Sequence, residues 1–382
     1  MTQKLKITKV DPILLSAQHG DHPKHLPTGF RAAGLVRIEC SDGTTGLGES
    51  YLAVYAPEVY KAFIEHFAPY LLGEDPLDIP AVMNKLRRQC LWWGWTGPSV
   101  SALSAIDIAL WDIKGKVAKA PVYTLLNGSQ NNKSIPLYAS GGTPKPYEEL
   151  RQEMEQYLAD GYSAIKIRIG PWRQNEVEKT GFVREVVGPE VKLMVDAVQS
   201  INQPSWTGEE ASRTAKSLEP FDPFWIEEPC GSFDINGYAM VRKNTSVPVA
   251  GGETLTTPAM FDLFFEADAL GIAQPDATHV GGISDTLQVC LSGHKYRVPM
   301  ALHAWGTAVC MAANYHVGFA IPNCLILERP ALDNPLIPAL LKEPFQVRDG
   351  HLLPPTAPGL GLELTEEVLS RFAYRPGSAY QI

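Results

Sequence analysis

The chain has 382 residues, of which 45% are apolar and 20% charged, values typical of a globular protein with room for two or three domains. Its net charge is −9 and no basic stripe stands out, which argues against nucleic acid and anionic membranes as partners. No apolar run is long enough to span a bilayer, the first residues do not resemble a signal peptide, and the six cysteines form no CxxC pair, so we expect a cytoplasmic protein with reduced thiols.

The first 130 residues predict strands followed by helices. Residues 5–16 and 35–51 are expected to form antiparallel strands, and the second segment contains the hairpin-turn sequence SDGTTG. Residues 56–126 predict helices that end in a long amphipathic helix over 102–119. Pro121 and Gly128 then interrupt the chain, so we place the first domain at 1–130.

From residue 134 the pattern alternates between strands and helices. Helix-length segments separate apolar, strand-like runs, which cover 134–140, 164–170, 192–198, 224–229, 247–253, 271–277, 298–305 and 324–330. This alternation predicts an α/β fold with a (β/α)8-type barrel, for which we assign residues 131–344. The polar, Pro- and Gly-rich tail, 345–382, is expected to pack back on the first domain.

Nearly all of these runs end in charged or polar side chains, a placement that packing alone does not explain. In barrels of this type the active site lies where the strands end, so these side chains are expected to meet at one rim. The residues concerned are Lys166, Arg168, Asp196, Glu227, Glu253, Asp276, His303 and Glu328.

Three of these strand ends carry carboxylates, Asp196, Glu227 and Glu253. A buried carboxylate is costly unless a cation meets it, and three that converge form an oxygen-rich site for a hard divalent cation. We therefore predict one Mg2+ per subunit. Taken singly, each carboxylate also fits a salt bridge to a neighbouring helix. Glu228 follows Glu227 directly and is expected to point the opposite way along the strand.

Lys166 and Arg168 lie two positions apart on one strand, so both are expected to face the barrel interior. They fit either a buried ion pair with the carboxylates or a catalytic base beside a fixed charge. A free lysine has a pKa of about 10.4, and Arg168 with a nearby metal would lower the pKa of Lys166 towards a useful range. Arg168 stays protonated at any working pH and cannot be a base.

His303 and Asp276 end neighbouring strands, which places an imidazole beside a carboxylate. Such a pair fixes the histidine tautomer and supports the imidazolium, so His303 and Lys166 would offer proton-transfer groups on opposite faces of a substrate. A lone histidine on an apolar strand also fits a core residue. Glu328 would donate a hydrogen bond if it is kept protonated, and a salt bridge to Arg329 is the alternative.

Together these groups would hold a carboxylate substrate through the metal and remove the proton next to that carboxylate. The metal and the lysine would stabilise the resulting enediolate.

The chain resembles the enolase superfamily, in the mandelate racemase/muconate lactonizing enzyme family and its mandelate racemase subgroup, over nearly its whole length. The motifs that carry the resemblance are SAIDIALWDIKGK (104–116), KIRIG (166–170), VDAVQ (195–199), WIEEP (225–229), AGGET (250–254), QPDATHVGGIS (274–284), LHAWG (302–306), ILERP (326–330) and PGLGLEL (358–364). The resemblance implies a (β/α)7β TIM-like barrel with an α+β capping domain formed by the N-terminal region and the C-terminal tail.

The same resemblance implies residue roles. It assigns Mg2+ to Asp196, Glu227 and Glu253, and thus chooses Glu227 over Glu228. It also implies an Asp276–His303 dyad, Glu328 as an electrophilic hydrogen-bond donor, and a homo-oligomer between dimer and octamer. Asp276, in place of a lysine, points to racemases and sugar-acid dehydratases, and the LHAWG motif to acid-sugar dehydratases and aldarolactone cycloisomerases.

Two positions depart from the family pattern. The second strand usually reads Lys-x-Lys with the second lysine as base, and here that position is Arg168. The third strand usually reads Asp-x-Asn, and here Val198 replaces the asparagine. Because racemisation needs a base on each face, Arg168 favours a one-base dehydration, and Val198 predicts a substrate that differs from the common ones.

Substrate contacts are expected from the segment 18–30, which holds three histidines and a lysine, and from 50–55, which holds two tyrosines. We name Arg168, His25, Tyr51 and Trp305 as substrate-binding candidates, although a solvated mobile loop fits 18–30 equally well. His22 and His25 have HxxH spacing, but nothing helical supports a metal pair there.

The resulting hypothesis is a Mg2+-dependent dehydratase of a sugar acid, either an aldonate or an aldarate. Within the same superfamily the alternative is a racemase, epimerase or aldarolactone cycloisomerase. A zinc amidohydrolase would need His-x-His after its first strand, which 134–142 lacks. A barrel that binds ligand without catalysis is the third alternative, since Arg168 and Val198 break the family pattern.

Overall fold

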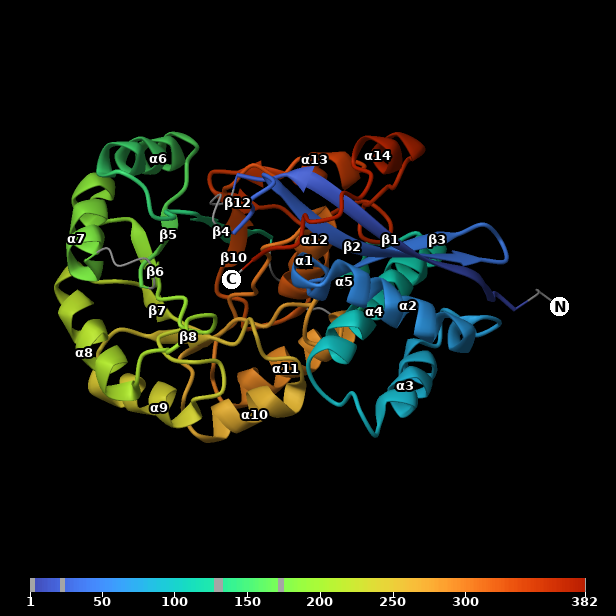
Figure 1. Ribbon diagram of the computed structural model, residues 1–382, viewed down its shortest axis with the longest axis horizontal. Coiled ribbons are helices and arrows are strands. Elements are labelled where there is room, and N and C mark those ends of the chain that lie inside the picture. Colours follow the sequence, from blue (N-terminus) through green and yellow to red (C-terminus); the bar gives the residue numbers. More distant parts are fainter. Residues whose placement is uncertain (1–3, 21–24, 127–132, 171–174, 382) are drawn as a thin grey trace.

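The computed structural model describes residues 4–20, 25–126, 133–170 and 175–381. Figure 1 shows a barrel on the left, surrounded by green to orange helices, and a second body on the right built from blue strands and blue-to-cyan helices. The red C-terminal part of the chain runs along the upper side of this second body. Among the described residues, no helix has both the length and the apolar character needed to cross a membrane.

The second body begins with the antiparallel sheet that the sequence predicted. Strands β1 (Ile7–Gln18), β2 (Phe30–Cys40) and β3 (Thr45–Ser50) pair in that order. The turn between β2 and β3 is closed by Asp42, whose carboxylate accepts a hydrogen bond from the Thr44 amide at 2.9 Å. This is the turn chemistry expected of an Asp-Gly sequence.

Five helices follow the sheet, and the fourth of them packs closely on it. They are α1 (Leu52–Tyr55), α2 (Pro57–Leu71), α3 (Ile79–Cys90), α4 (Pro98–Ala118) and α5 (Val122–Leu125). The sequence predicted an amphipathic helix over 102–119, but α4 is buried on nearly all sides between Ser99 and Ile113. One face packs on β3, and another meets the barrel, where Asp107 accepts a hydrogen bond from the Ser284 hydroxyl at 2.6 Å. A helix enclosed in this way has no polar face to display.

The barrel strands are parallel and pair in chain order. They are β4 (Ile135–Ser140), β5 (Ala164–Arg168), β6 (Lys192–Asp196), β7 (Trp225–Glu227), β8 (Val249–Gly251), β9 (Ile272–Ala273) and β10 (Leu327–Pro330), and β10 pairs with β4 to close the circle. The helices around them are α6 (Tyr147–Ala159), α7 (Glu176–Val187), α8 (Gly208–Leu218), α9 (Ile235–Asn244), α10 (Pro258–Glu266), α11 (Ile283–Lys295) and α12 (Ala308–Ala320), and a short 3-10 turn, η1 (Glu219–Phe221), follows α8.

The predicted strand at 298–305 is reduced to single bridges at Met300, which pairs with Ala273 on one side and Cys324 on the other. Pro275 and Pro299 lack the amide hydrogen that a longer ladder would need at these positions. The chain therefore passes through the seventh barrel position without forming an extended strand, and His303 sits on irregular backbone.

The C-terminal part contacts both bodies. After α13 (Leu336–Leu340), the hairpin of β11 (Val347–Arg348) and β12 (His351–Leu352) pairs antiparallel with barrel strand β4. After α14 (Glu366–Arg371), the chain returns to the N-terminal sheet, where the Ser16 amide donates to the Phe372 carbonyl at 2.9 Å. The division at 1–130, 131–344 and 345–382 remains our proposal.

Two glycines of β3 allow α4 to pack directly on the sheet. A Cβ added at Gly48 would lie 1.7 Å from the carbonyl oxygen of Ala105, and one added at Gly46 would lie 2.1 Å from that of Ala109. Only a residue without a side chain fits at such a distance, so these glycines set the separation between sheet and helix.

Gly48→Ala should therefore lower the free energy of unfolding by about 1–3 kcal/mol or more, because the helix must move away from the sheet. Urea unfolding followed by circular dichroism measures this change. Gly20→Ala is the matched control, since its added Cβ would lie no closer than 3.3 Å to a neighbouring atom. Equal stabilities of the two variants would contradict this account of the packing.

Candidate active site

A closed apolar layer crosses the barrel below the strand ends. Each of the eight barrel positions contributes one side chain to it: Tyr138, Ala164, Met194, Trp225, Ala250, Ile272, Ala301 and Ile326. Because strand side chains alternate between faces, the next inward residue lies two positions further along. Those residues include Lys166, Asp196, Glu227, His303 and Glu328, and all five are buried. The apolar layer thus forms the floor of the polar site that the sequence predicted.

The three predicted metal ligands lie on the adjacent strands β6, β7 and β8 or directly after them. Burial raises the pKa of Asp196 to about 7, and the neighbouring charge of Glu227 adds to the rise. Burial also raises the pKa of Glu253 against the opposing charge of His303. These shifts have one physical cause, which is the crowding of carboxylates away from water.

Lys166 lies inside this acidic cluster. Its Nζ atom is 2.5 Å from Glu227 Oε1, 3.3 Å from Glu328 Oε1 and 3.8 Å from Asp196 Oδ2. Burial acts to lower the pKa of Lys166, but Glu227 and then Glu328 outweigh it and raise the pKa well above its usual value. The sequence predicted a lowered pKa. The structure gives the opposite direction because three carboxylates surround the ammonium group.

Arg168 lies next to Lys166 on β5, at the wall of the pocket. Its guanidinium carbon is 4.2 Å from the centroid of the Trp305 ring, and its Nε atom is 4.0 Å from Asp196 Oδ2. The buried ammonium of Lys179, on α7, donates to the Arg168 carbonyl at 2.7 Å and to the Gly142 carbonyl at 2.8 Å. Lys179, which the sequence reading did not single out, therefore fixes the backbone that carries Arg168.

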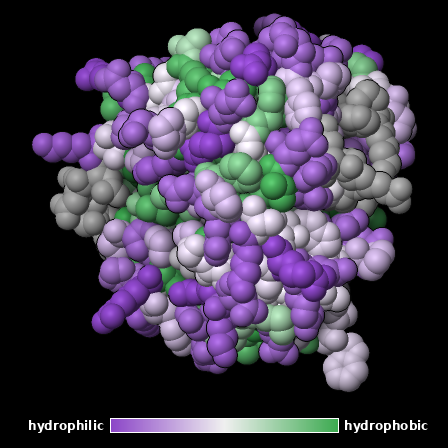
Figure 2. Space-filling view, turned by 90° about the vertical axis from the view of Figure 1, so that its left-hand side faces the viewer, coloured by the Kyte–Doolittle hydropathy of each residue, from purple (hydrophilic) through white to green (hydrophobic). Residues whose placement is uncertain are grey.

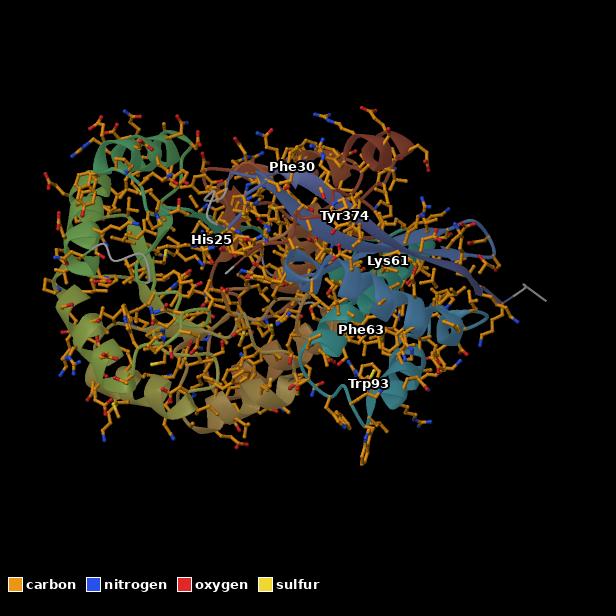
Figure 3. All side chains as sticks on the ribbon, in the orientation of Figure 1. His25, Phe30, Lys61, Phe63, Trp93 and Tyr374 are labelled. Carbon is orange, nitrogen blue, oxygen red and sulfur yellow. The ribbon has the colours of Figure 1, made fainter. Side chains whose placement is uncertain are left out.

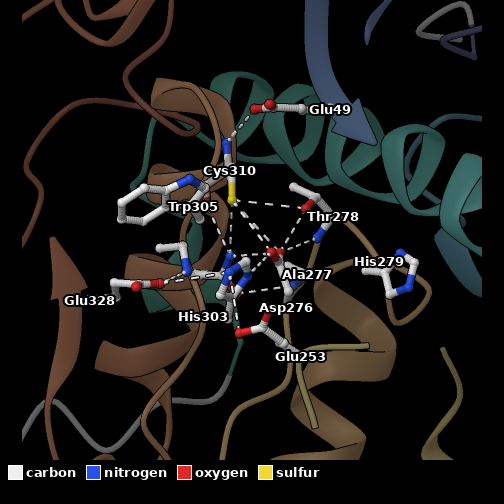
Figure 4. Close-up of polar contacts among 12 residues, drawn as sticks. Glu49, Glu253, Asp276, Ala277, Thr278, His279, His303, Trp305, Cys310 and Glu328 are labelled. Carbon is white, nitrogen blue, oxygen red and sulfur yellow. Dashed lines mark hydrogen bonds and ion pairs between the residues drawn. The ribbon is translucent and has the colours of Figure 1, made fainter. Parts of the chain in front are cut away.

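The Asp276–His303 pair forms with hydrogen-bonding geometry, 2.7 Å between Oδ2 and Nδ1 (Figure 4). The other oxygen of Asp276 accepts from the Thr278 amide at 2.7 Å and from the Asn314 amide group at 3.0 Å. Burial acts to lower the pKa of His303, but the charges of Glu253 and Glu328 and the bond to Asp276 raise it to about 10. The imidazole is thus held as a cation, with Nε2 directed towards Glu253 at 3.6 Å.

Glu328 lies between the two cations. Burial acts to raise its pKa, but Lys166 and His303 lower it to about 2, and the Ala304 amide donates to its Oε2 at 2.7 Å. The sequence predicted a protonated Glu328 that donates a hydrogen bond. In this geometry Oε2 accepts a hydrogen bond and the two cations favour the ionised carboxylate, whereas the donor role of Glu328 beside metal-bound oxygens stays a prediction.

Glu228 also belongs to the acidic cluster, contrary to the expectation that it would point away from Glu227. Its backbone has φ +45°, so strand alternation ends at this residue. Its side chain is buried, and burial together with the charges of Glu253 and Asp196 raises its pKa well above the usual range. The Ser200 hydroxyl donates to one of its carboxylate oxygens, and the other is buried without a hydrogen-bond partner.

Val198 has φ +51°, a conformation that is strained for a β-branched residue and that asparagine adopts more readily. Its amide donates to Asp196 Oδ1 at 2.9 Å, and its side chain lines the pocket. The turn that orients Asp196 is therefore formed with a valine, without a side-chain amide at this position.

The residues present fit Mg2+ by their chemistry. Carboxylate oxygens from three adjacent strand ends are the ligands this ion prefers, and the partnerless buried oxygen of Glu228 beside them is a sign of missing positive charge. Within the described ranges, no three His, Cys, Asp or Glu side chains already surround one metal-sized point. Lys166 instead neutralises Glu227 and Glu328.

The pocket above these groups is closed by the N-terminal domain. It has a cavity volume of about 60 Å3, and Arg168, His25, Tyr51 and Trp305 all line it, as do Arg31 and Tyr380. Tyr51 meets the His303 ring edge-on with centroids 5.5 Å apart, and His25 stacks on Tyr380 at 4.9 Å. The four substrate-binding candidates are thus brought to one cavity, whereas His22 and Lys24 lie outside the described residues.

Glu49, on β3, connects the N-terminal domain to the catalytic dyad. Its buried carboxylate accepts from the Thr307 hydroxyl at 2.6 Å and from the Cys310 amide at 2.8 Å, and so caps the start of α12. The same helix carries Cys310, whose Sγ lies 3.7 Å from both oxygens of Asp276 (Figure 4). It also carries Asn314, which donates to Asp276 at 3.0 Å. The sequence reading missed Glu49, because only the fold places it at this helix.

Comparison with known proteins identifies the family. Residues 149–368 match the family described as enolase C-terminal domain-like, and residues 23–127 match the mandelate racemase/muconate lactonizing enzyme N-terminal domain. The chain belongs to the mandelate racemase/muconate lactonizing enzyme family of the enolase superfamily. The predicted fold class, a TIM-like barrel with an α+β capping domain, is confirmed.

Members of this family that the chain resembles are lyases and isomerases. It is 34% identical to D-galactarolactone cycloisomerase of Agrobacterium fabrum, over 90% of this chain and 91% of that protein. It is 33% identical to arabinonate dehydratase of Saccharolobus solfataricus, over 88% and 89%. A racemase structure from Streptomyces coelicolor with bound magnesium superposes with a TM-score of 0.85 at 30% identity, over 96% and 100%. The chain is therefore an enzyme, and neither the amidohydrolase nor the non-catalytic alternative stands.

Glu49→Ala should lower the free energy of unfolding by about 1–3 kcal/mol, because it leaves buried donors of Thr307 and Cys310 without an acceptor. It should also disturb the His303 Nδ1 proton, seen by NMR as a shifted or broadened downfield resonance. Glu39→Ala, on the neighbouring strand β2, is the control. A Glu49 variant with wild-type stability and an unchanged His303 resonance would contradict the proposed connection.

Proposed function

We propose that this enzyme is a Mg2+-dependent dehydratase of a sugar acid, an aldonate or an aldarate, that removes the proton alpha to the carboxylate through an enediolate. The observation that carries the proposal is the placement of a hydrogen-bonded Asp276–His303 pair and of Lys166 around one acidic, pocket-facing rim. The relatives that act as arabinonate and galactonate dehydratases support it.

Asp196, Glu227 and Glu253 would hold the Mg2+, and Glu328 and Glu228 lie close enough to shape its surroundings. When bound, the ion supplies a Lewis acid that binds the substrate carboxylate and stabilises the charge that develops on it. The carboxylates that raise the pKa of His303 and Lys166 include these ligands. Neutralising them would bring both pKa values down and make either group a more effective proton acceptor.

The proton transfers are assigned to His303 and Lys166. One group accepts the proton alpha to the carboxylate, and the departing β-hydroxyl leaves as water after it receives a proton from an acid. The hydrogen bond to Asp276 holds the His303 ring with Nε2 towards the pocket and stabilises the imidazolium. We therefore assign to His303 the proton transfer to or from the substrate. The resulting enol rearranges to a 2-keto-3-deoxy acid without further help from a base on the opposite face.

The remaining pocket residues would bind the substrate. Arg168 lies over the Trp305 ring and offers a cation to a carboxylate or hydroxyl. His25 and Tyr51 close the pocket from the capping domain, where they can meet the hydroxyl groups of a polyhydroxylated acid.

A second candidate is the isomerase activity of the same family, racemisation, epimerisation or lactone cycloisomerisation. The similarity to D-galactarolactone cycloisomerase favours it. Running the reaction in D2O separates the candidates, since an epimerase exchanges the alpha hydrogen without loss of water, whereas a dehydratase yields a keto product.

The test is a screen of acid sugars with Mg2+ for formation of a 2-keto-3-deoxy acid, followed by the variant His303→Asn on any substrate found. The variant removes the proton-transfer group but keeps a polar side chain of similar size, so kcat should fall about 10²–10⁴-fold. His351→Asn, far from the rim on β12, is the matched control and should keep wild-type turnover. Undiminished turnover by His303→Asn would refute the assignment.

A further inference from the structure

The segment 141–144, which follows β4, forms part of the pocket surface. Thr143 and Pro144 line the pocket together with Arg168, at the end of the next strand, β5. The segment and the strand are joined by a hydrogen bond in which the Arg168 amide donates to the Gly142 carbonyl at 3.3 Å. We call segment 141–144 together with Arg168 the arginine wall.

The arginine wall packs tightly against the elements behind it. A Cβ added at Gly141 would lie 2.2 Å from the hydroxyl oxygen of Tyr157, on α6, and one added at Gly142 would lie 2.6 Å from Cγ2 of Ile167, on β5. Gly142 also has φ +59°, a left-handed conformation that glycine adopts without strain. The backbone of the wall therefore follows α6 and β5 closely, and a change behind it reaches the pocket.

Lys179, on α7, holds the wall from behind. Its Nζ atom donates to the Gly142 carbonyl at 2.8 Å and to the Arg168 carbonyl at 2.7 Å, and the residue is only 1% exposed. Burial lowers the pKa of Lys179 to about 7 against the nearby charge of Glu153. An ammonium in such a place costs free energy that an apolar side chain of similar size would not. The two hydrogen bonds to the wall are what the lysine supplies in return.

Glu153, on α6, acts on the other side of the same glycine. Its Oε1 atom accepts from the Gly142 amide at 3.1 Å and from the Tyr157 hydroxyl at 2.5 Å, and its Oε2 atom lies 2.9 Å from the ammonium of Lys145. Gly142 thus has its amide bonded to an anion and its carbonyl bonded to a cation. Hydrogen bonds with one charged partner are stronger than neutral ones. We call Glu153 and Lys179 the clamp.

The clamp departs from the surrounding pattern of the barrel helices. Figure 2 views the molecule from the side on which α6 and α7 lie, and this face is mostly hydrophilic. Figure 3 shows many side chains of these helices with their oxygen and nitrogen atoms directed outward. Charged side chains on such helices are normally solvated. Two that turn inward from different helices and meet at one residue therefore indicate a specific task at that residue.

We propose that Glu153 and Lys179 are positioning residues that set the affinity for substrate by holding Arg168 and Thr143 at the pocket. Neither clamp residue is among those that line the cavity, so each acts through the wall. The inference rests on the proposed function, in which Arg168 binds the substrate. A cation and a hydroxyl held in place bind without first being ordered. Because such contacts act in the ground state and the transition state alike, their loss should raise KM and leave kcat nearly unchanged.

The first test needs no substrate and measures hydrogen–deuterium exchange of the Gly142 and Arg168 amides in the full-length protein. Lys179→Met keeps a long side chain without the ammonium, and both amides should then exchange about tenfold faster or more, because the wall opens more often. Glu153→Leu should speed exchange at Gly142, whereas Glu153→Gln keeps an acceptor and should stay near the wild-type rate. Unchanged exchange in both Lys179→Met and Glu153→Leu would overturn the inference.

Lys216→Met on α8 and Glu155→Leu on α6 are the matched controls, since both residues are exposed. They should leave the exchange of the wall at the wild-type rate. Circular dichroism spectra that match the wild type will confirm that the variants fold.

The second test uses a substrate found in the acid-sugar screen. Lys179→Met should raise KM about tenfold or more and leave kcat within about threefold of the wild type. Glu153→Gln should keep the wild-type KM. Mg2+ affinity measured by calorimetry should not change, because the three predicted metal ligands belong to other strands. A fall in kcat at unchanged KM, or wild-type values of both, would overturn the inference. If the wild type converts no acid sugar, the proposed function fails, and the exchange rates alone decide whether the clamp holds the wall.

Discussion

Negative charge buried at the ends of adjacent barrel strands is the constraint on which the rest of this site depends. Asp196, Glu227 and Glu253 are removed from water, and the apolar floor below them prevents solvent from reaching them from within the barrel. Such groups remain ionised only if cations neutralise them. Within the described residues, Lys166 and His303 provide this compensation, and it falls short, since the pKa values of Asp196 and Glu253 stay raised.

The same charges explain the behaviour of the catalytic candidates. Lys166 and His303 have raised pKa values because they compensate the carboxylates, and Glu328 has a lowered pKa because it lies between these two cations. A divalent cation at the three strand ends would change all of these values together. Metal binding and proton transfer at this rim are therefore coupled through the same buried charges.

The capping domain contributes to this site both directly and at a distance. It closes the pocket with His25, Arg31 and Tyr51, and Arg31 donates to the Trp305 carbonyl at 2.9 Å. Glu49 acts behind the rim, where it caps the helix whose side chains hold Asp276. The position of the dyad therefore depends on correct packing between the two domains. Within the capping domain, Gly46 and Gly48 admit α4 close to the strand that carries Glu49.

The sequence predicted the parts of the site that follow from strand periodicity. Lys166, Asp196, Glu227 and Glu328 lie two positions after a floor residue, so a regular strand suffices to place them on the rim.

Glu228 was placed incorrectly because its left-handed backbone breaks the alternation. The seventh strand was predicted too long. Its prolines lack the amide hydrogens of a longer ladder, and this matters only at positions that face a neighbouring strand, which the sequence alone does not identify. Glu49 and Lys179 could not be found at all, because each acts on a segment distant in sequence that only the fold brings near. The charge states of Lys166 and Glu328 depend on distances between strands, which no linear pattern encodes.

The most direct measurement is calorimetric titration of metal-free protein with Mg2+ at neutral pH, in buffers of different ionisation enthalpy, for the wild type and for Asp196→Asn. The account predicts one ion per chain for the wild type. It also predicts a heat that varies with the buffer, because Asp196, with a pKa of about 7, loses its remaining proton when the ion binds. In the variant, binding should be weakened at least tenfold and the proton release reduced. Wild-type protein that takes up no Mg2+, or a variant that binds it as tightly, would contradict the central claim.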